Sequence, residues 1–256
     1  MKRRHKGMDR QLAGKVALIT GAVRRNGRAI ALALAREGAA IIINARRSRE
    51  EAERVVAEIE AGGGSALVCI ADITDETAVR RMFDEIVARF GRLDILVNNA
   101  ADRNQVPFET MTMEQWRHIV RIILDGTFLC ARAAIPLMLK NGWGRVVNIT
   151  GDGNHMTSYT ARAHSAAAKA GVEGLTRSLA AEFAGRNITV NAISPGRIGG
   201  ERAKSAGTAP DPDMVPPVGR TGVPEDVADA VRFVCLPASS FITGQVLRVN
   251  GGQFLP

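Results

Sequence analysis

Cysteine and tyrosine are scarce in this chain of 256 residues, which holds three cysteines and one tyrosine. Cys69, Cys130 and Cys235 each stand alone inside an apolar run, so no two of them have the spacing of a metal site. Their odd number and wide separation also argue against a disulfide framework. We therefore expect three buried, reduced thiols and no bound metal.

Long apolar runs and a leader segment are also missing. We find no run of about 18 apolar residues that would predict a membrane-spanning helix. The first ten residues include five Lys or Arg with no apolar stretch behind them, which argues against a signal peptide. We expect a disordered basic tail over residues 1–11, a cytoplasmic location and no membrane contact. The basic tail could attract nucleic acid, but no aromatic residues are interleaved with it, which argues against that partner.

Short apolar runs alternate with longer helical patterns along the rest of the chain. Runs that are apolar throughout indicate strands buried on both faces, as in a parallel sheet. Strict alternation predicts a single α/β domain over residues 12–256, with a doubly wound, seven-stranded parallel sheet and helices on both faces. A segment rich in Gly, Pro and Ala, 199–220, is expected to be a mobile loop over a site. The predicted strands are 15–19, 39–44, 66–70, 93–100, 145–150, 188–194 and 245–250, and the predicted helices are 28–38, 49–64, 75–91, 113–140, 158–184 and 224–236.

A glycine-containing loop follows the first predicted strand and opens the first helix, reading "TGAVRRNGRAIA" from Thr20 to Ala31. Gly21 permits the tight turn, and Gly27 lets the helix begin close to the strand. The helix N-terminus can then receive a phosphate, with Arg24, Arg25 and Asn26 beside it. The loop therefore predicts a dinucleotide site at the carboxyl ends of the strands.

The end of the second strand reads "NARRS" and contains no acidic residue. A carboxylate there would accept hydrogen bonds from the ribose hydroxyls of NAD, and it would repel a 2′-phosphate. Here the residues are Asn44, Arg46, Arg47 and Ser48, and guanidinium groups pair with phosphate at two points. We predict NADP(H) as the cofactor, with Arg47 the residue that is most easily explained as a solvated helix start.

Four further segments follow this loop in order and extend the pattern to a resemblance that covers the chain after residue 12. "TGAVRRNG", "ADI" (71–73), "NNAA" (98–101), "SPGRI" (194–198) and "ITGQVLRVNGG" (242–252) resemble motifs of the short-chain dehydrogenase/reductase family. Arg25 stands where that family usually has glycine, and an arginine at this position resembles its pteridine-reductase branch. The overall texture resembles the 3-oxoacyl-carrier-protein reductases.

The resemblance implies a Rossmann fold and a homotetramer that assembles through the 105–184 helices and the last strand. It also assigns further cofactor contacts. Asp72 and Ile73 would contact adenine, Asn99 and Ala100 would contact the cofactor from the polar end of the fourth strand, and Pro195, Gly196 and Ile198 would close over the nicotinamide.

The catalytic positions of the family are only partly kept. The family supplies a proton from a tyrosine four residues before a lysine, and that spacing puts both side chains on one helix face. In "HSAAAKAG" the lysine is Lys169, which would bind the nicotinamide ribose, but Ser165 takes the place of the tyrosine. The usual serine position falls on Gly151, beside Thr150, and the usual asparagine position falls on Ile123.

Several residues are candidates to replace the missing tyrosine. Ser165 keeps a hydroxyl, and His164 titrates near neutrality but points about 100° away around the helix. The other candidates are the single tyrosine, Tyr159, and the loop residues Asp152, Asn154 and His155. Serine before a retained lysine resembles the dienoyl-CoA reductases of the same family.

These observations favour an NADP(H)-dependent oxidoreductase that reduces a carbonyl, or oxidises an alcohol, on a small or acyl-thioester substrate. A dienoyl- or enoyl-thioester reductase is one alternative. The loss of three usual residues leaves a second alternative open, a cofactor-binding sensor or structural subunit without redox activity.

Overall fold

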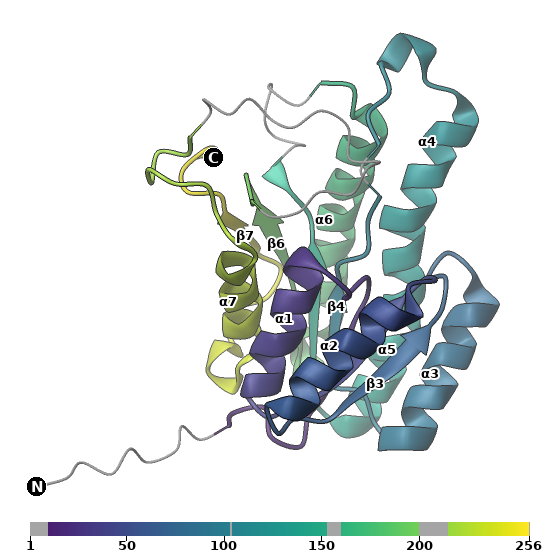
Figure 1. The fold of residues 1–256 in the computed structure, drawn as a ribbon, viewed down its shortest axis with the longest axis vertical. Helices are drawn as coiled ribbons and strands as arrows, with labels where there is room; N and C mark the ends of the chain where they lie inside the picture. Colours follow the sequence, from purple (N-terminus) through teal and green to yellow (C-terminus); the bar gives the residue numbers. More distant parts are fainter. Residues whose placement is uncertain (1–9, 103, 153–159, 200–214, 256) are drawn as a thin grey trace, which may run out of the picture.

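The computed structural model describes residues 10–102, 104–152, 160–199 and 215–255. Its centre is a seven-stranded, all-parallel sheet with the order β3-β2-β1-β4-β5-β6-β7, and the strand arrows point toward the top of Figure 1. The expected doubly wound fold is confirmed, because the order reverses between β1 and β4. The strands are β1 Val16–Ile19, β2 Ala40–Ala45, β3 Ala66–Ile70, β4 Ile95–Asn98, β5 Gly144–Ile149, β6 Ile188–Pro195 and β7 Val246–Val249.

Helices cover both faces of the sheet (Figure 1). One face carries α1, α2 and α7, and the other carries α3, α5 and α6. α4 packs beside α6 through Ile119, which lies in one apolar cluster with Ala168 and Val172. The helices are α1 Arg25–Arg36, α2 Arg49–Ala61, α3 Glu76–Phe90, α4 Met113–Val120, α5 Gly126–Asn141, α6 Ala163–Phe183 and α7 Pro224–Cys235.

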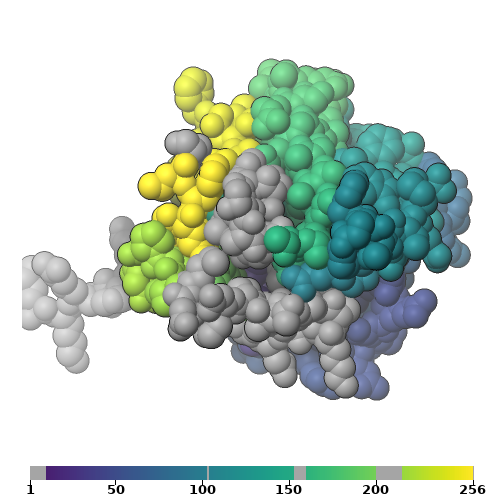
Figure 2. Space-filling view, turned by 90° about the horizontal axis from the view of Figure 1, so that it is seen from above, coloured from purple at the N-terminus to yellow at the C-terminus, as the bar shows by residue number. Residues whose placement is uncertain are grey.

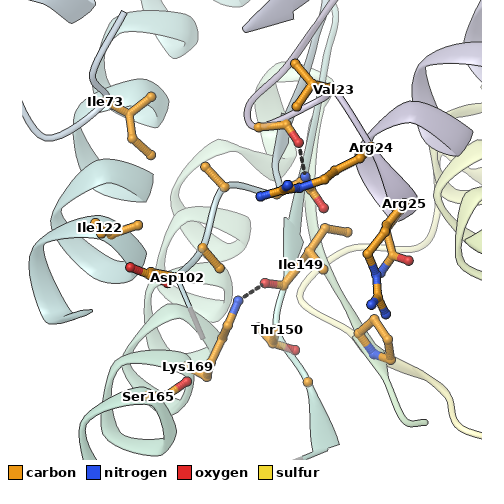
Figure 3. A pocket seen from close by; sticks show the side chains of 18 of the residues that line it. Val23, Arg24, Arg25, Ile73, Asp102, Ile122, Ile149, Thr150, Ser165 and Lys169 are labelled. Atoms are coloured by element: carbon orange, nitrogen blue, oxygen red, sulfur yellow. Dashed lines mark hydrogen bonds between the residues drawn. The ribbon is translucent and has the colours of Figure 1, made fainter. Parts of the chain in front are cut away.

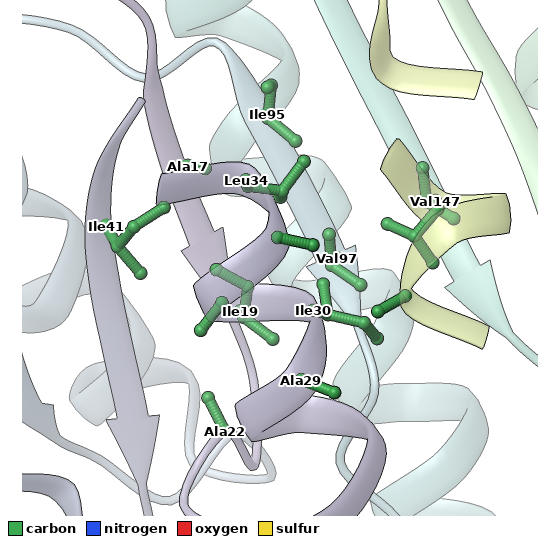
Figure 4. Packing of buried hydrophobic residues seen from close by; sticks show 14 of the residues in the cluster. Ala17, Ile19, Ala22, Ala29, Ile30, Leu34, Ile41, Ile95, Val97 and Val147 are labelled. Atoms are coloured by element: carbon green, nitrogen blue, oxygen red, sulfur yellow. The ribbon is translucent and has the colours of Figure 1, made fainter. Parts of the chain in front are cut away.

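The apolar strands are buried because successive side chains point to opposite, covered faces. In β1, Ala17 and Ile19 point toward α1, whereas Val16 and Leu18 join the cluster under α3 and α5. Figure 4 shows the first cluster, in which Leu34 of α1 lies over the strands. Because every pair of neighbouring strands is parallel, their carboxyl ends form one common edge of the sheet.

Several elements differ from the sequence-based prediction, three of them near the site. α1 begins at Arg25 rather than residue 28, and α6 begins at Ala163 rather than residue 158. The predicted helix 113–140 is divided by a π-helical turn, Arg121–Asp125. Such a turn inserts an extra residue into the helix and often marks a functional site.

The three cysteines are free and buried, as predicted. Burial raises the pKa of Cys130 and Cys235 to about 12. Burial, with the nearby Glu85, also raises the pKa of Cys69 to about 12. These thiols are therefore core residues and not nucleophiles.

One described helical stretch, Met113–Asn141, is long and apolar enough to cross a membrane by length and composition alone. Charged residues interrupt it, so it contains no unbroken run of about 18 apolar residues. Core helices meet the same criterion, and Cys130, Ala134 and Met138 of this stretch are buried against α3 and the sheet. The stretch is therefore weak support for a membrane segment.

Two predicted segments fall largely outside the described residues. These are residues 1–9 of the predicted basic tail and residues 200–214 of the predicted mobile loop. Arg10 already belongs to the turn before β1, where its carbonyl oxygen accepts a hydrogen bond from Ala13 N at 3.0 Å.

Candidate functional site

The crevice of the fold opens where the sheet order reverses, between the ends of β1 and β4. Hydrogen bonds join the two strand ends there. The Thr20 hydroxyl accepts from the backbone N–H groups of Asn99 and Ala100 at 2.9 and 3.0 Å. The Asn99 amide donates to the carbonyl oxygens of Thr20 and Gly21 at 2.9 and 3.0 Å. This network fixes the loop before α1 in one position.

Gly27 brings α1 against that loop. A Cβ atom at Gly27 would lie 2.5 Å from the Gly21 carbonyl oxygen and 2.7 Å from Asn99 Nδ2, so only glycine fits. The first turn of α1 contains no acidic residue, which leaves the positive end of the helix dipole open to an anion. A close backbone approach and an uncompensated helix N-terminus are the features that a dinucleotide diphosphate requires.

Arg25 adopts a backbone conformation that usually belongs to glycine, with φ 48°. This explains why the family usually has glycine at this position. Its Nη2 atom donates a hydrogen bond to the Ile198 carbonyl oxygen at 3.0 Å. The arginine therefore links the loop before α1 to the segment after β6, on opposite sides of the crevice.

Asn44, at the end of β2, has a structural role. Its side chain is buried, and its Nδ2 donates to the carbonyl oxygens of Cys69 and Ala71 at 3.3 and 3.1 Å. Its Oδ1 accepts from Gly21 N at 3.4 Å. An aspartate here would place a carboxylate oxygen against two carbonyl oxygens. The hydrogen bonds of Asn44 therefore also disfavour an acidic residue at this position.

Asp72 and Arg46 lie near each other at one end of the site. Burial raises the pKa of Asp72, but hydrogen bonds from Thr74 and the charges of Arg46 and Arg121 outweigh it, and the net pKa is lowered. The Thr74 N–H and hydroxyl donate to Asp72 Oδ1 at 2.9 and 2.8 Å. Asp72 is therefore a fixed carboxylate acceptor.

A pocket of about 640 Å³ collects these elements at the carboxyl ends of the strands (Figure 3). Its volume lies in the range of small-molecule and cofactor sites. Every residue proposed from the sequence as a cofactor contact lines it: Gly21, Arg24, Arg25, Asn26, Gly27, Asn44, Arg46, Ser48, Asp72, Ile73, Asn99, Ala100, Lys169, Pro195, Gly196 and Ile198. The structure thus brings together side chains that are up to 177 positions apart in numbering, from Gly21 to Ile198.

Lys169, Ser165 and Thr150 also line the pocket. Lys169 Nζ donates to the Ile149 carbonyl oxygen at 2.5 Å, which holds the ammonium group over the end of β5 (Figure 3). Thr150 Oγ1 donates to the Ile193 carbonyl oxygen at 3.3 Å. At Gly151, where the family has serine, an added Cβ atom would meet nothing closer than 3.7 Å. Space for a serine is present, and the hydroxyl is not.

Ile123 occupies the usual asparagine position and lies in the π-helical turn. Its side chain is buried in an apolar cluster with Ala168 and Val172 of α6. Ala168 directly precedes Lys169 in the sequence. The turn therefore presents an apolar side chain at the position where the resemblance implies an amide. No amide at residue 123 is available to hold a relay water.

His164 does not join the site. It is fully buried, it is not among the pocket residues, and its Nδ1 accepts a hydrogen bond from Ser165 N at 2.9 Å. Burial, with the charges of Arg162 and His118, lowers its pKa against a backbone hydrogen bond with Arg162 that raises it. The suggestion that His164 serves as a catalytic acid is therefore corrected to a packing role.

The remaining candidates from the sequence divide into one described residue and three that are not. Tyr159, Asn154 and His155 lie outside the described residues. Asp152 is described and buried, and its two carboxylate oxygens accept from Ser194 Oγ and Asn250 Nδ2, each at 2.5 Å. Asp152 therefore ties the ends of β6 and β7 to the loop after β5.

Two pocket features were missed in the sequence. Asp102 lines the pocket, and its Oδ2 lies 3.2 Å from Nε2 of His118 on α4. Arg162 and Arg197 add positive charge to the lining. Asp102 and His118 follow no motif, so no pattern signals them.

From above, Figure 2 shows α6 between the C-terminal segment on one side and the residues around α4 on the other.

Comparison with known proteins shows the family of the chain. The family described as "Enoyl-(Acyl carrier protein) reductase" matches residues 21–253. The chain belongs to the short-chain dehydrogenase/reductase family. It is 39% identical over 245 residues to a 3-oxoacyl-[acyl-carrier-protein] reductase of Synechocystis sp., covering 95% of this chain and 98% of that one. It is 38% identical over 243 residues to the 3-oxoacyl-[acyl-carrier-protein] reductase of Staphylococcus aureus, covering 94% and 98%.

A solved structure agrees in fold as well. A dehydrogenase/reductase from Sinorhizobium meliloti matches with a TM-score of 0.87 and 32% sequence identity, over 95% of this chain and 96% of that one. The relatives named above are oxidoreductases. The Rossmann-type sheet of this chain is the one expected from the sequence.

Proposed function

We propose that the protein is an NADP(H)-dependent oxidoreductase that reduces a carbonyl, or oxidises the corresponding alcohol, on an acyl-thioester or other small substrate. The observation that carries this proposal is that Lys169 and Ser165 line the same pocket as all the expected dinucleotide contacts. The named relatives make a 3-oxoacyl thioester the first substrate to test.

The lining fits NADP(H) at both ends of the pocket. Gly21, Gly27 and the α1 N-terminus suit the diphosphate, because the glycine positions admit no Cβ and the helix end is positive. Arg46 and Ser48, with Arg24 in the loop before α1, line the same pocket and suit a 2′-phosphate, because guanidinium pairs with phosphate at two points.

The bound nicotinamide would supply a hydride. Lys169 would hold its ribose and place a positive charge beneath it. Ser165 would donate a hydrogen bond to the substrate oxygen or to a water molecule. Such preorganised donors stabilise the negative charge that develops on a reduced carbonyl oxygen.

The test is turnover of NADPH with a panel of 3-oxoacyl, enoyl and dienoyl thioesters and simple ketones. We expect 3-oxoacyl reduction, and a loss of at least about 100-fold in kcat for Lys169→Met. Lys140→Met is the matched control, because Lys140 is exposed at the end of α5 and does not line the pocket. Unchanged turnover in Lys169→Met would refute the assigned role. Reduction of the enoyl or dienoyl thioesters alone would shift the reaction to that alternative.

A second function is favoured by one specific observation: Ser165, Gly151 and Ile123 replace three of the four usual catalytic residues. It is an NADP(H)-binding sensor or structural subunit without redox activity. Tight NADPH binding without turnover of any compound in the panel would support it.

We further propose three properties of the whole protein. They are a homotetramer, a cytoplasmic location, and one domain over residues 12–256 after a basic tail. Light scattering of the purified full chain tests the first of these.

A further inference from the structure

The loop after β5 places a buried carboxylate in the lining of the pocket. Asp152 is 1% exposed, and its two oxygens accept hydrogen bonds from Ser194 Oγ and Asn250 Nδ2, each at 2.5 Å. Donors at both oxygens favour the ionised form, and both donors are uncharged. A buried carboxylate with neutral partners lies in a medium of low polarity, so its negative charge acts strongly on a molecule that binds beside it.

The sheet order shows which end of the pocket this carboxylate belongs to. The expected diphosphate contacts lie at the end of β1, and the expected adenosine contacts lie at the ends of β2 and β3. Because the order runs β3-β2-β1-β4-β5-β6-β7, the other half of a dinucleotide extends toward the ends of β5 and β6. Figure 3 shows Ile73 at one end of the pocket and Thr150 and Lys169 at the other. Asp152, which follows β5 and is bonded to Ser194 of β6, therefore lies at the nicotinamide end.

The position of the carboxylate is fixed by the C-terminal segment. Asn250 Nδ2 also donates to the Phe254 carbonyl oxygen at 2.8 Å, and Asn250 Oδ1 accepts from Gly252 N at 2.9 Å. The Asn250 side chain therefore has no freedom to turn away from Asp152 without the loss of these bonds. The charge of Asp152 is thus held in one place before any ligand binds.

Positive groups line the pocket beside this carboxylate. Lys169 holds its ammonium group 2.5 Å from the Ile149 carbonyl oxygen, three positions before Asp152. Arg162, before α6, and Arg197, after β6, also line the pocket. These cations repel a positive charge on a bound ligand, and a buried carboxylate at the same end offsets them.

We propose that the Asp152 carboxylate stabilises the oxidised cofactor relative to the reduced cofactor and so favours hydride transfer out of NADPH. The inference rests on the proposed function. Carbonyl reduction moves a hydride from the nicotinamide to the carbonyl carbon and a proton from water to the oxygen, which leaves one positive charge on the ring. Asp152 attracts this charge, whereas Lys169 repels it. Asp152 acts through its charge alone, so it needs no contact with the reacting atoms.

One substitution separates this role from a merely structural one. In Asp152→Asn the new carbonyl oxygen can accept from Asn250 Nδ2, and the new amide can donate to Ser194 Oγ. The variant therefore removes the charge and keeps both links. Asp152→Ala removes the charge and the links together. A structural role predicts a change in Asp152→Ala alone, whereas the charge predicts the same change in both variants.

The experiment measures the dissociation constants of NADP⁺ and NADPH by calorimetry with the full-length protein. Their ratio shows how far binding shifts the cofactor toward its oxidised form. We expect the ratio of Kd for NADP⁺ to Kd for NADPH to rise by at least about fivefold in Asp152→Asn and in Asp152→Ala. Lys169→Met should change the ratio in the opposite direction, because it removes a cation from the same end.

Asp72→Asn is the matched control. Asp72 is a carboxylate of the same pocket, but it lies at the adenine end, where NADP⁺ and NADPH are identical. The substitution should change both affinities alike and leave their ratio within about twofold of wild type.

The outcomes separate this proposal from the function on which it rests. A ratio in Asp152→Asn within about twofold of wild type overturns the charge role, and wild-type turnover then leaves the oxidoreductase intact. A ratio that changes in Asp152→Ala and not in Asp152→Asn shows a structural role, and also overturns it. If Asp152→Asn does not fold, an unchanged ratio in Asp152→Ala overturns the proposal in the same way. A wild type that binds neither NADP⁺ nor NADPH removes both proposals.

Discussion

Replacing Gly27 by alanine should damage both stability and cofactor binding. The new methyl group would lie 2.5 Å from the Gly21 carbonyl oxygen, 2.7 Å from Asn99 Nδ2 and 2.8 Å from Ala22 Cα. Two of these three contacts are with backbone, so relief requires α1 to move away from the loop. Overpacking of this kind costs about 1–3 kcal/mol, and loss of the Asn99 hydrogen bond to Gly21 adds about 1 kcal/mol. We expect the free energy of unfolding to fall by about 2–4 kcal/mol.

Thermal unfolding and NADPH titration measure this effect. For a chain of this size the loss corresponds to a Tm about 5–15 °C lower. NADPH affinity should fall by at least about 10-fold, because the helix end no longer meets the diphosphate. Gly185→Ala is the control, since no atom lies within 4 Å of an added Cβ there and the residue is exposed. If Gly27→Ala melts and binds NADPH like Gly185→Ala, the close approach of loop and helix is wrong.

Three further changes test other contacts. Arg46→Ala should weaken NADPH binding by about 10- to 100-fold with little effect on NADH binding, and Arg47→Ala should weaken NADPH binding less. Calorimetry with both cofactors measures these affinities, and equal losses for NADPH and NADH would contradict the phosphate contact. Arg25→Gly should be more stable than Arg25→Ala by about 1 kcal/mol in urea unfolding, because alanine keeps the strain of the positive φ at residue 25; equal stability would show that the strain is absent. His164 has a folded-state pKa below its ordinary 6.5, so only the unfolded chain takes up its proton as the pH falls through that value, and stability should drop. His164→Gln should lose less stability than wild type between about pH 7.5 and about pH 5.5, and a parallel decline in both proteins would refute the shift.

The strands and the cofactor site could be predicted because their signals are local. The alternating apolar runs gave each strand within two or three residues, and the loop at Gly21 and Gly27 sits beside the strand and helix that it joins. The start of α1 was misplaced because Arg25, not a glycine, adopts the positive φ. The π-helical turn was missed because "RIILDGTF" continues the helical pattern without a break.

The catalytic end was less accessible to sequence reasoning. Ser165 and His164 are neighbours, and only the burial of α6 shows which of them faces the pocket. Asp102 and His118 are separated by 16 positions, on a loop and on a helix, and only the folded chain places them together. Residues that act through tertiary contacts leave no spacing rule in the sequence.

The most direct test of the central claim is transfer of label from NADPH deuterated at C4 to a 3-oxoacyl thioester. If the pocket binds NADP(H) over Lys169 and reduces carbonyls, mass spectrometry will find one deuterium at C3 of the 3-hydroxyacyl product, and Lys169→Met will abolish it. Bound NADPH that passes no deuterium to this substrate, or to any other carbonyl or thioester in the panel, would contradict the claim.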